Sequence, residues 1–445
     1  MSATPSLQPI SLSSAFWYWF KLGFISFGGP AGQIALMHAE LVERRRWISE
    51  RRFLHALNYC MLLPGPEATQ LAVYIGWLMH RTAGGIMAGA LFVLPSLAIL
   101  VGLSWAYLAF GDVPAVAAVL YGIKPAVVAI VLAAAWRIGS RSLNNAFLAT
   151  IAASAFVAIT FLKLLFPVIV LAAALAGVLG ARLRPHWFAS AAVHGGTSRA
   201  PALPALIDDD TPTPHHARFS WARLLASTLT GIGLAALGLV ALAMHYGMTN
   251  PLTQMGWFFT KAALVTFGGA YAVLPYVFQS AVEQHQWLSA TQMMDGLALG
   301  ETTPGPLIMI VAFVGFMGGW TKAVAGADAL FSGGLLGACV ATFFTFLPSF
   351  VFILAGGPLV EATRGNIRFS APLTAISAAV VGVIVSLAAL FAQHVFHLER
   401  APAQWDYAAI ALATAACVAL IRFKVGVIPL ILACALLGLG LVGWR

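Results

Sequence analysis

The stretch FISFGGPAGQ, residues 24–33, decides the fold because it places Gly-Gly-Pro inside a long apolar segment. A second copy, LVTFGGAYAV, occupies residues 264–273. Proline lacks the N–H that a helix needs, and glycine readily adopts non-helical backbone. In lipid, such a break is tolerated only where protein or a water-filled cavity surrounds it. Each stretch therefore predicts a broken helix inside a membrane protein.

The composition of the whole chain agrees with a membrane location. Hydrophobic residues make up 60% of its 445 residues and charged residues only 9%, whereas soluble domains carry about 25% charged residues. This excludes a disordered, fibrous or nucleic-acid-binding protein and a soluble enzyme with a conventional surface. The four cysteines lie in apolar stretches without metal-ligand spacing. We therefore expect an all-α polytopic transmembrane protein with no metal, no cofactor and no nucleic-acid partner.

The sequence contains an internal duplication. An offset of 240 positions superposes residues of the two halves, and an offset of 253 superposes Leu94-Pro95-Ser96 on Leu347-Pro348-Ser349. The pairs at the first offset are Trp17 and Trp257, Lys21 and Lys261, Phe27-Gly28-Gly29 and Phe267-Gly268-Gly269, Glu43 and Glu283, Trp47 and Trp287, and Pro64-Gly65-Pro66 and Pro304-Gly305-Pro306. The expected domains are an N-terminal repeat at 1–181, a cytoplasmic polar linker at 182–223, a connecting helix at 224–247 and a C-terminal repeat at 248–445.

The distribution of arginine indicates that the two repeats are inverted. The loop after the first stretch holds five arginines and its counterpart holds none. The arginines are Arg44, Arg45, Arg46, Arg51 and Arg52, and their counterparts are Gln284, His285, Gln286, Thr291 and Gln292. Lys and Arg of short loops stay on the cytoplasmic side of a membrane, so the equivalent loops are expected to face opposite sides. The helix at 224–247 has no equivalent, and it would create the inversion.

Each repeat is expected to contain two re-entrant helical hairpins and about four spans. Hairpins broken at FGGP and PGP cover about 14–43 and 53–80, with copies at about 256–283 and 293–320. Hairpins leave the arginine loop and Arg81 on the same side, whereas full spans, the alternative, would separate them. The other spans are expected at about 84–108, 115–136, 146–163, 167–181, 327–356, 372–392, 406–421 and 425–443. The N-terminus is then cytoplasmic and the C-terminus periplasmic.

The helix breaks predict an anion site near the membrane midplane. A half-helix that begins at a break presents free N–H groups and the positive end of its dipole. Equivalent breaks in two inverted halves are typical of a transporter's site, although kinks for close helix packing are an alternative. The predicted substrate-binding residues are Lys21, Gly28, Gly29, Pro30, Gln33, Pro64, Gly65, Pro66, Thr69, Gln70, Lys261, Gly268, Gly269, Thr302, Thr303, Pro304, Gly305 and Pro306.

Three lysines in apolar surroundings are candidate ligands of that anion. Lys21 and Lys261 are repeat-equivalent, and a charge within the membrane costs about 3 kcal/mol or more unless it has a partner or ligand. The alternative is that both side chains reach the membrane surface. Lys124 is a weaker candidate because its counterpart is Ser377.

Two acidic residues beside the PGP breaks are candidates for proton coupling. Glu67 follows the first break and Glu301 precedes the second. A carboxyl group in a low-dielectric cavity can take up protons near neutral pH. The alternative for Glu67 is a charge that stabilises the dipole of its own half-helix. Asp295 and His55 are secondary candidates.

The motifs in both halves resemble the chromate ion transporter (CHR) family, two-domain type. The first half carries Phe27-Gly28-Gly29-Pro30, Gln33, Trp47, Leu63-Pro64-Gly65-Pro66, Gln70, Gly76 and Leu94-Pro95-Ser96. The second half carries Phe267-Gly268-Gly269, Trp287, Asp295-Gly296, Glu301-Thr302-Thr303-Pro304-Gly305-Pro306 and Gly315. Ala270 replaces the proline of the second FGGP, so the two hairpins need not contribute equally to a site.

This resemblance implies a secondary transporter of the bacterial inner membrane that exports chromate, is driven by the proton motive force and confers chromate resistance. Its expected partners are chromate, protons, the lipid bilayer and a possible second copy in a homodimer. Sulfate, a tetrahedral dianion of similar geometry, is an alternative substrate, and a passive anion channel is an alternative mechanism. An intramembrane enzyme acting on lipid phosphates is the rival of another class, but equivalent positions offer no pair of acids and no nucleophile with a base. We therefore expect no catalytic residue.

Overall fold

Nearly all of the chain that the structure describes is helical. The structure is a computed structural model, and it describes residues 10–111, 113–184, 188, 205–208, 211–212, 214–267, 269–362, 370–398 and 404–443. Six helices in this part are long and apolar enough to cross a membrane: Glu67–Phe110, Pro114–Ser142, Phe166–Leu183, Trp221–Tyr246, Ala327–Glu361 and Ala371–Phe396. The predicted all-α polytopic membrane fold is confirmed.

The first half begins with short helices that stop and restart at the predicted breaks. The elements are α1 (Leu12–Ile25), α2 (Gly29–His38), the π-helix η1 (Ala39–Arg44), α3 (Glu50–Cys60), α4 (Glu67–Phe110), α5 (Pro114–Ser142), α6 (Ala146–Thr160) and α7 (Phe166–Leu183). Gly28, with φ 88°, separates α1 from α2, and proline stands in the first turn of α2. The PGP break separates α3 from α4.

The second half follows the same order after α8 (Trp221–Tyr246). The elements are α9 (Pro251–Leu264), α10 (Ala270–Phe278), the π-helix η4 (Gln279–Gln284), α11 (Ala290–Thr302), η5 (Leu307–Met309), α12 (Ile310–Thr321), η6 (Ala327–Ala329), α13 (Leu330–Ala362), α14 (Ser370–Phe396), β1 (His397–Leu398), β2 (Gln404–Trp405), α15 (Tyr407–Ile421) and α16 (Val427–Gly443). Even the two π-helices coincide at the offset of 240 positions. The local structure therefore repeats along with the sequence.

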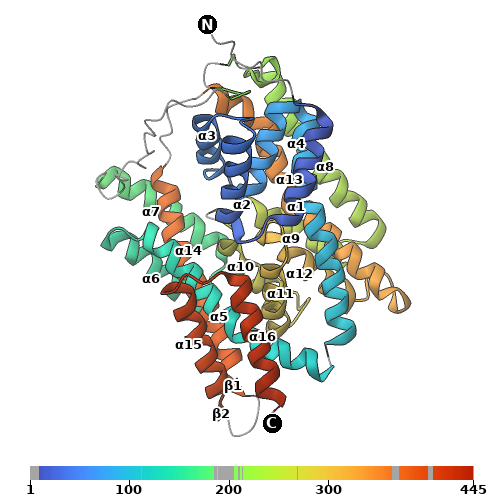
Figure 1. Cartoon of the computed structure of the whole chain (residues 1–445), viewed down its shortest axis with the longest axis vertical. Coiled ribbons are helices and arrows are strands. Elements are labelled where there is room, and N and C mark those ends of the chain that lie inside the picture. Colours follow the sequence, from blue (N-terminus) through green and yellow to red (C-terminus); the bar gives the residue numbers. More distant parts are fainter. Residues whose placement is uncertain are drawn as a thin grey trace.

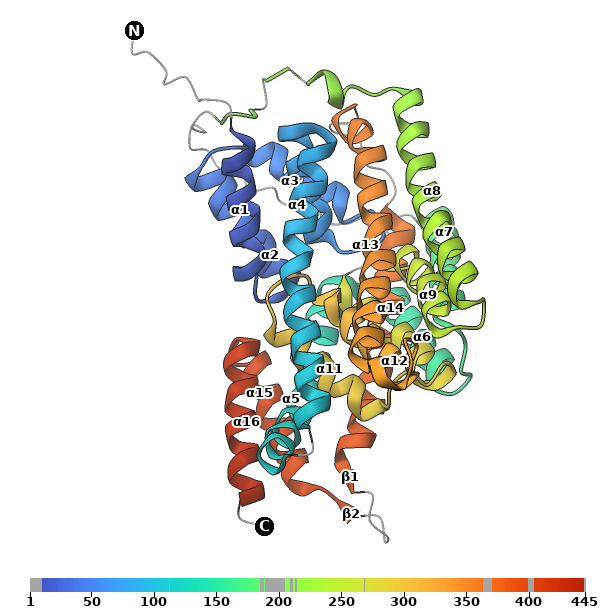
Figure 2. The same cartoon turned by 90° about the vertical axis from the view of Figure 1, so that its right-hand side faces the viewer.

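Helix α4 consists of two limbs that fold back on each other. Its backbone leaves the helical conformation at His80 and Arg81. A Cβ on Gly76 would lie 2.5 Å from the carbonyl oxygen of Gly84, so the limbs pack with their backbones in close approach. The second limb is the span predicted at about 84–108. Figure 2 shows α4 and α13 running alongside each other through the molecule, with α1 and α3 towards one end and α11 and α12 towards the other.

The polar linker contacts the first half. Ile207 pairs with Ile48 in a single parallel bridge, and the Ile207 carbonyl accepts from the Ser49 N–H at 3.0 Å. Further on, a ring nitrogen of His216 lies 3.1 Å from the Trp77 carbonyl. These contacts hold the described part of the linker against the loop that carries the arginine cluster. In Figure 1 this segment lies at the same end of the molecule as α3.

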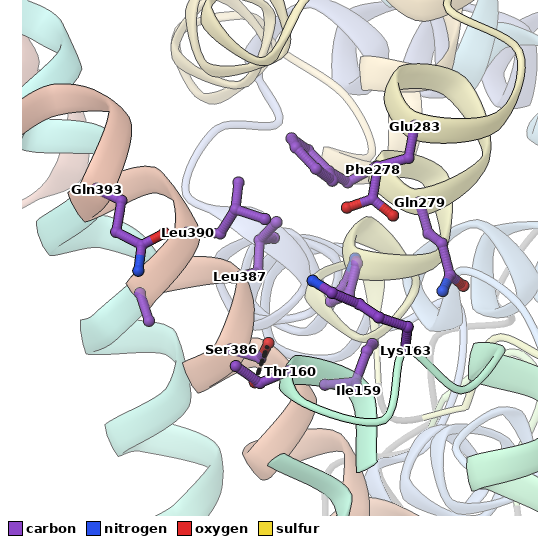
Figure 3. Close-up of a pocket in the computed structure, with 12 residues that line it drawn as sticks. Ile159, Thr160, Lys163, Phe278, Gln279, Glu283, Ser386, Leu387, Leu390 and Gln393 are labelled. Atoms are coloured by element: carbon purple, nitrogen blue, oxygen red, sulfur yellow. Dashed lines mark hydrogen bonds between the residues drawn. The ribbon is translucent and has the colours of Figure 1, made fainter. Parts of the chain in front are cut away.

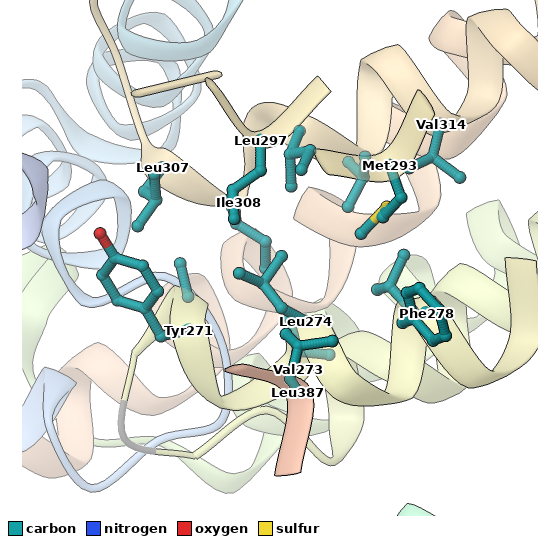
Figure 4. Packing of buried hydrophobic residues seen from close by; sticks show 14 of the residues in the cluster. Tyr271, Val273, Leu274, Phe278, Met293, Leu297, Leu307, Ile308, Val314 and Leu387 are labelled. Carbon is teal, nitrogen blue, oxygen red and sulfur yellow. The ribbon is translucent and has the colours of Figure 1, made fainter. Parts of the chain in front are cut away.

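The largest apolar core lies around the short helices of the second half. Figure 4 shows side chains of α10, α11, η5 and α14 packed together, among them Leu274, Met293, Ile308 and Leu387. A second core joins α1, α3 and the first limb of α4 to α13. The PGP breaks of both halves are enclosed by protein, which is the condition under which non-helical backbone is tolerated at membrane depth, whereas Phe27 and Gly28 of the first FGGP break are exposed.

Candidate functional site between the helix breaks

The four helix breaks meet through a reciprocal pair of backbone hydrogen bonds. The Gly65 N–H donates to the Thr266 carbonyl at 2.8 Å, and the Gly305 N–H donates to the Ser26 carbonyl at 2.8 Å. Gly65 and Gly305 are equivalent at the offset of 240, and so are Ser26 and Thr266. Each PGP break is therefore joined to the backbone just before the FGG of the other half.

Only glycine fits at the centre of each PGP break. Gly65 has φ 119° and Gly305 has φ 103°, positive values that residues with a side chain rarely adopt. A Cβ on Gly65 would lie 2.4 Å from the Ser349 Oγ, and a Cβ on Gly305 would lie 2.7 Å from the Ser96 Cβ. These serines belong to the two Leu-Pro-Ser motifs. The breaks of one half therefore rest on the long helix of the other half.

Two predicted glutamines hold the breaks in place. The Gln33 amide on α2 donates to the carbonyl of Gly305 in the other half. The Gln70 amide on α4 donates to the Pro64 carbonyl at 2.7 Å and lies 3.4 Å from the Ser349 hydroxyl. Both side chains are fully buried. Their first role in this structure is thus to satisfy carbonyls that the helix breaks leave free.

Four buried polar atoms near the breaks have no hydrogen-bond partner within the described residues. They are Gln33 Oε1, Gln70 Oε1, Thr69 Oγ1 and Ser96 Oγ. Hydroxyl groups can donate as well as accept, and α2 and α4 begin at the breaks with free N–H groups. The two hydroxyls and these N–H groups can donate to the oxygens of an anion, whereas the two amide oxygens can only accept. By contrast, the hydroxyls of Thr302 and Thr303 donate to Leu299 and Gly300 of their own helix at 2.9 Å.

The two predicted acids have different surroundings. Glu67 lies in the first turn of α4 and is partly exposed. Glu301 is buried near the end of α11 and accepts a hydrogen bond from the Tyr271 hydroxyl of α10. The repeat equivalents of Glu301 and Tyr271 are Met61 and Ala31, so this pair belongs to the second half alone.

The structure does not bring Lys21 and Lys261 to the breaks. Both side chains are exposed, on α1 and α9. Within the described residues, Lys261 Nζ lies over the Trp257 ring, 5.5 Å from its centroid. Their predicted role as anion ligands stays a prediction. Gly268 lies outside the described residues, whereas Gly29 and Gly269 adopt positive φ at their helix starts, and Pro30, Pro66, Pro304 and Pro306 flank the breaks as predicted.

Two clusters of side chains join distant parts of the chain, and the sequence alone does not show that their members meet. Asp295 of α11 meets Lys124 of α5 and Tyr107 of α4. Glu361 of α13 accepts a hydrogen bond from the Tyr74 hydroxyl of α4. In the sequence, each cluster is marked only by an acidic residue in an apolar segment. Its partners could not be identified, because more than 170 positions separate them in sequence.

A separate cavity of about 100 Å³ lies between the loop after α6, the α10–η4 segment and α14. Figure 3 shows Lys163, Gln279, Glu283 and Gln393 around it, with the Thr160 and Ser386 hydroxyls 2.8 Å apart. The predicted substrate-binding and proton-coupling residues are not among its lining residues.

These features define a class: a multi-pass helical membrane protein whose broken helices meet at a buried polar centre, as in secondary transporters. The family model described as Chromate transporter matches the chain twice, over residues 13–178 and 253–439. The chain belongs to the chromate transporter family.

Relatives with the same description match nearly the whole chain. A chromate transport protein of Pseudomonas aeruginosa is 32% identical over 442 residues, which is 98% of this chain and 92% of that protein. One from Cupriavidus metallidurans is 30% identical over 427 residues, 96% of this chain and 92% of that protein. An uncharacterized transporter of Methanocaldococcus jannaschii is 24% identical over 385 residues, 86% of this chain and 85% of that protein. No solved structure matches the chain.

Proposed function

We propose that this protein is a secondary transporter that exports chromate across the bacterial inner membrane, is coupled to the proton motive force and confers chromate resistance. Membership in the chromate transporter family supports chromate transport. The observation that carries the mechanism is the reciprocal hydrogen bonding of the two PGP breaks at 2.8 Å. It joins each PGP break to the FGG break of the other half, and an oxyanion can bind to the N–H groups that such breaks leave free.

Two inverted repeats account for this reciprocity. A pseudo-two-fold axis in the membrane plane makes each half contribute the same atoms to the other. In this arrangement the broken helices are re-entrant hairpins and their tips bind the substrate near the midplane. The rocking of one repeat against the other would then expose the tips to each side in turn.

Glu301 is the proposed main proton carrier and Glu67 a second one. Glu301 is buried beside the breaks, and the Tyr271 hydroxyl that it accepts from can stabilise its ionised form. A change in its charge next to the substrate tips would alter the affinity for a dianion. This coupling distinguishes a transporter from a passive anion channel, which is the second mechanism that broken helices permit.

The proposed orientation places the N-terminus and the arginine loop in the cytoplasm and the C-terminus in the periplasm. Single cysteines at positions 81 and 286, in a chain otherwise free of cysteine, test this orientation with a membrane-impermeant maleimide. Labelling from opposite faces is expected because Arg81 shares the side of the arginine loop and Gln286 lies in the equivalent loop of the inverted repeat. Labelling of both from one face would contradict the inverted hairpins.

The decisive experiment measures uphill movement of labelled chromate into everted membrane vesicles. A proton motive force should drive accumulation, and its collapse by an uncoupler should abolish it. Equilibration without accumulation would indicate a passive channel. Excess unlabelled sulfate should compete weakly if chromate is the preferred substrate, and accumulation of labelled sulfate in place of chromate would reassign the substrate.

A further inference from the structure

A buried carboxylate and a lysine meet where α11 packs against α5 and α4. Lys124 Nζ lies 3.9 Å from Asp295 Oδ2. The Tyr107 hydroxyl donates to the same oxygen at 2.9 Å. Asp295 stands seven residues before Thr302, so it lies about 10 Å along the helix axis from the PGP break. The cluster is therefore close to the tips but separate from the residues that form them.

Only one of the two carboxylate oxygens of Asp295 accepts a hydrogen bond within the part of the chain that the structure describes. Its Oδ1 is buried and accepts no hydrogen bond from the described residues. The other elements packed against α11, namely α12, α14, α16 and η5, provide no ion-pair partner in the part of the chain that the structure describes. A buried ionised carboxylate needs several close partners to offset its desolvation. A proton on Oδ1 would remove the charge that this site stabilises incompletely.

The side chains of Lys124 and Asp295 differ in solvent exposure. The side chain of Lys124 is 26% exposed, whereas that of Asp295 is 2% exposed. An anion can therefore approach the ammonium group of Lys124 from its open side while Asp295 stays enclosed. The pair has no copy in the other half, because the equivalents of Lys124 and Asp295 are Ser377 and His55.

We propose that Lys124 is a binding residue for the tetrahedral dianion and that Asp295 is the counter-ion that a proton displaces when the dianion binds. This inference rests on the proposed function and names the residues through which proton and substrate interact. In the resting state Asp295 is ionised and paired with Lys124. A proton taken up on Asp295 neutralises the carboxylate, and the freed ammonium group of Lys124 binds one oxygen of the dianion.

The charges balance at each step. The resting pair carries no net charge, and uptake of one proton and one dianion leaves the site with one net negative charge. When the dianion leaves, Asp295 releases its proton and the pair re-forms. Because the loaded site is negative, the inside-negative membrane potential favours outward movement. The proton leaves with the dianion, so the pH gradient opposes this step and the membrane potential is the component of the proton motive force that drives export.

The test is equilibrium binding of radiolabelled chromate to the purified full-length protein in detergent at about pH 7.5 and about pH 9, a range in which chromate stays mainly a dianion. Wild type should bind more tightly at the lower pH, because proton and dianion bind together. Asp295→Asn should bind more tightly than wild type at the higher pH and show a smaller difference between the two pH values, because this carboxyl group no longer takes up a proton. Lys124→Gln should lose about tenfold or more in affinity, and Lys124→Arg should retain most of it.

Asp406→Asn is the matched control. Asp406 accepts from the Tyr121 hydroxyl of α5 at 2.6 Å and has no lysine in contact within the described residues. Asparagine can also keep its helix cap. This variant should keep the pH dependence of wild type. Should Asp295→Asn fail to fold, Tyr107→Phe serves instead: loss of one donor to the ionised carboxylate should extend tight binding to higher pH.

The outcomes are separable. Wild-type pH dependence in Asp295→Asn, or wild-type affinity in Lys124→Gln, would overturn the proposed pair while chromate binding by wild type stands. Failure of the wild-type protein to bind chromate at either pH would overturn the proposed function itself.

Discussion

The two PGP breaks are held by the same backbone contacts but stand among different side chains. Gly65 and Gly305 make equivalent hydrogen bonds to the opposite half and rest on equivalent serines. Beside the second break lie Glu301 and Tyr271, and beside the first break the same positions hold Met61 and Ala31. Duplication has thus preserved the contacts of the tips, while each break has its own acid: Glu301 with Tyr271 beside the second, and Glu67, whose counterpart is Leu307, beside the first.

The loops after the first break of each half also keep equivalent contacts but carry different side chains. Arg45 lies over the Trp47 ring at 5.0 Å, and its equivalent His285 stacks on Trp287 at 4.7 Å. Burial, together with the nearby Lys261 and Lys322, lowers the pKa of His285 below its usual value, so this side chain is neutral at physiological pH. The contact with tryptophan is kept, and only the first loop carries the arginine cluster.

The largest expected effect comes from a side chain at the centre of either break. Gly305→Ala should reduce chromate uptake into everted vesicles by about tenfold or more, because positive φ costs an L-residue about 1–2 kcal/mol and the new Cβ meets the Ser96 Cβ. Gly65→Ala should be less severe, since it meets the end of the Ser349 side chain, which can rotate. Gly102→Ala, which meets open space in α4, is the matched control. Equal activity of all three would contradict the proposed packing of the tips.

The second prediction concerns the acids that distinguish the halves. Glu301→Gln should greatly weaken the pH dependence of chromate uptake while the protein still reaches the membrane, and Asp295 accounts for the dependence that remains. Glu67→Gln should change the pH profile less, because Glu67 is partly exposed and stands at a helix start. The pH profiles of uptake in everted vesicles decide between them. An unchanged profile for Glu301→Gln would exclude it as the proton carrier.

The third prediction compares the glutamines. Gln33→Ala leaves the Gly305 carbonyl of the other half without its side-chain donor, whereas Gln70→Ala affects mainly a carbonyl of its own half. We expect each to cost about 1–3 kcal/mol of stability, with the larger loss at Gln33. Thermal unfolding of the detergent-purified variants measures this, and the exposed Gln393→Ala provides the baseline. A larger loss at Gln70 would reverse the comparison.

The smallest effect is expected for Lys21→Ala and Lys261→Ala. Their exposed positions on α1 and α9 are those of side chains that reach the membrane surface. Chromate resistance should fall by less than about twofold at equal expression, the scale of a surface substitution. A large and equal loss in both variants would support the prediction from sequence that the two lysines are ligands of the anion.

Much of the local structure could be predicted from sequence. Glycine and proline act on their own backbone, so the breaks at Gly28 and Gly65 are found where the residues stand. Hydropathy likewise predicts the positions of α5, α8 and α14, although α5 and α14 extend six and four residues beyond their predicted ends. The turn at His80 and Arg81 could not be predicted in detail, because neither residue is a helix breaker and the close contact of Gly76 with Gly84 forms only in the folded hairpin.

The sequence by itself determined that this protein is a duplicated, all-helical membrane protein with four helix breaks, because these features depend on neighbouring residues and on a constant offset. The tertiary structure decided which breaks meet, which polar atoms they leave without partners, and that Lys124 faces Asp295 while Lys21 faces outwards. Such pairings depend on how helices pack across the molecule, and the rotation of a helix about its axis is set by its neighbours.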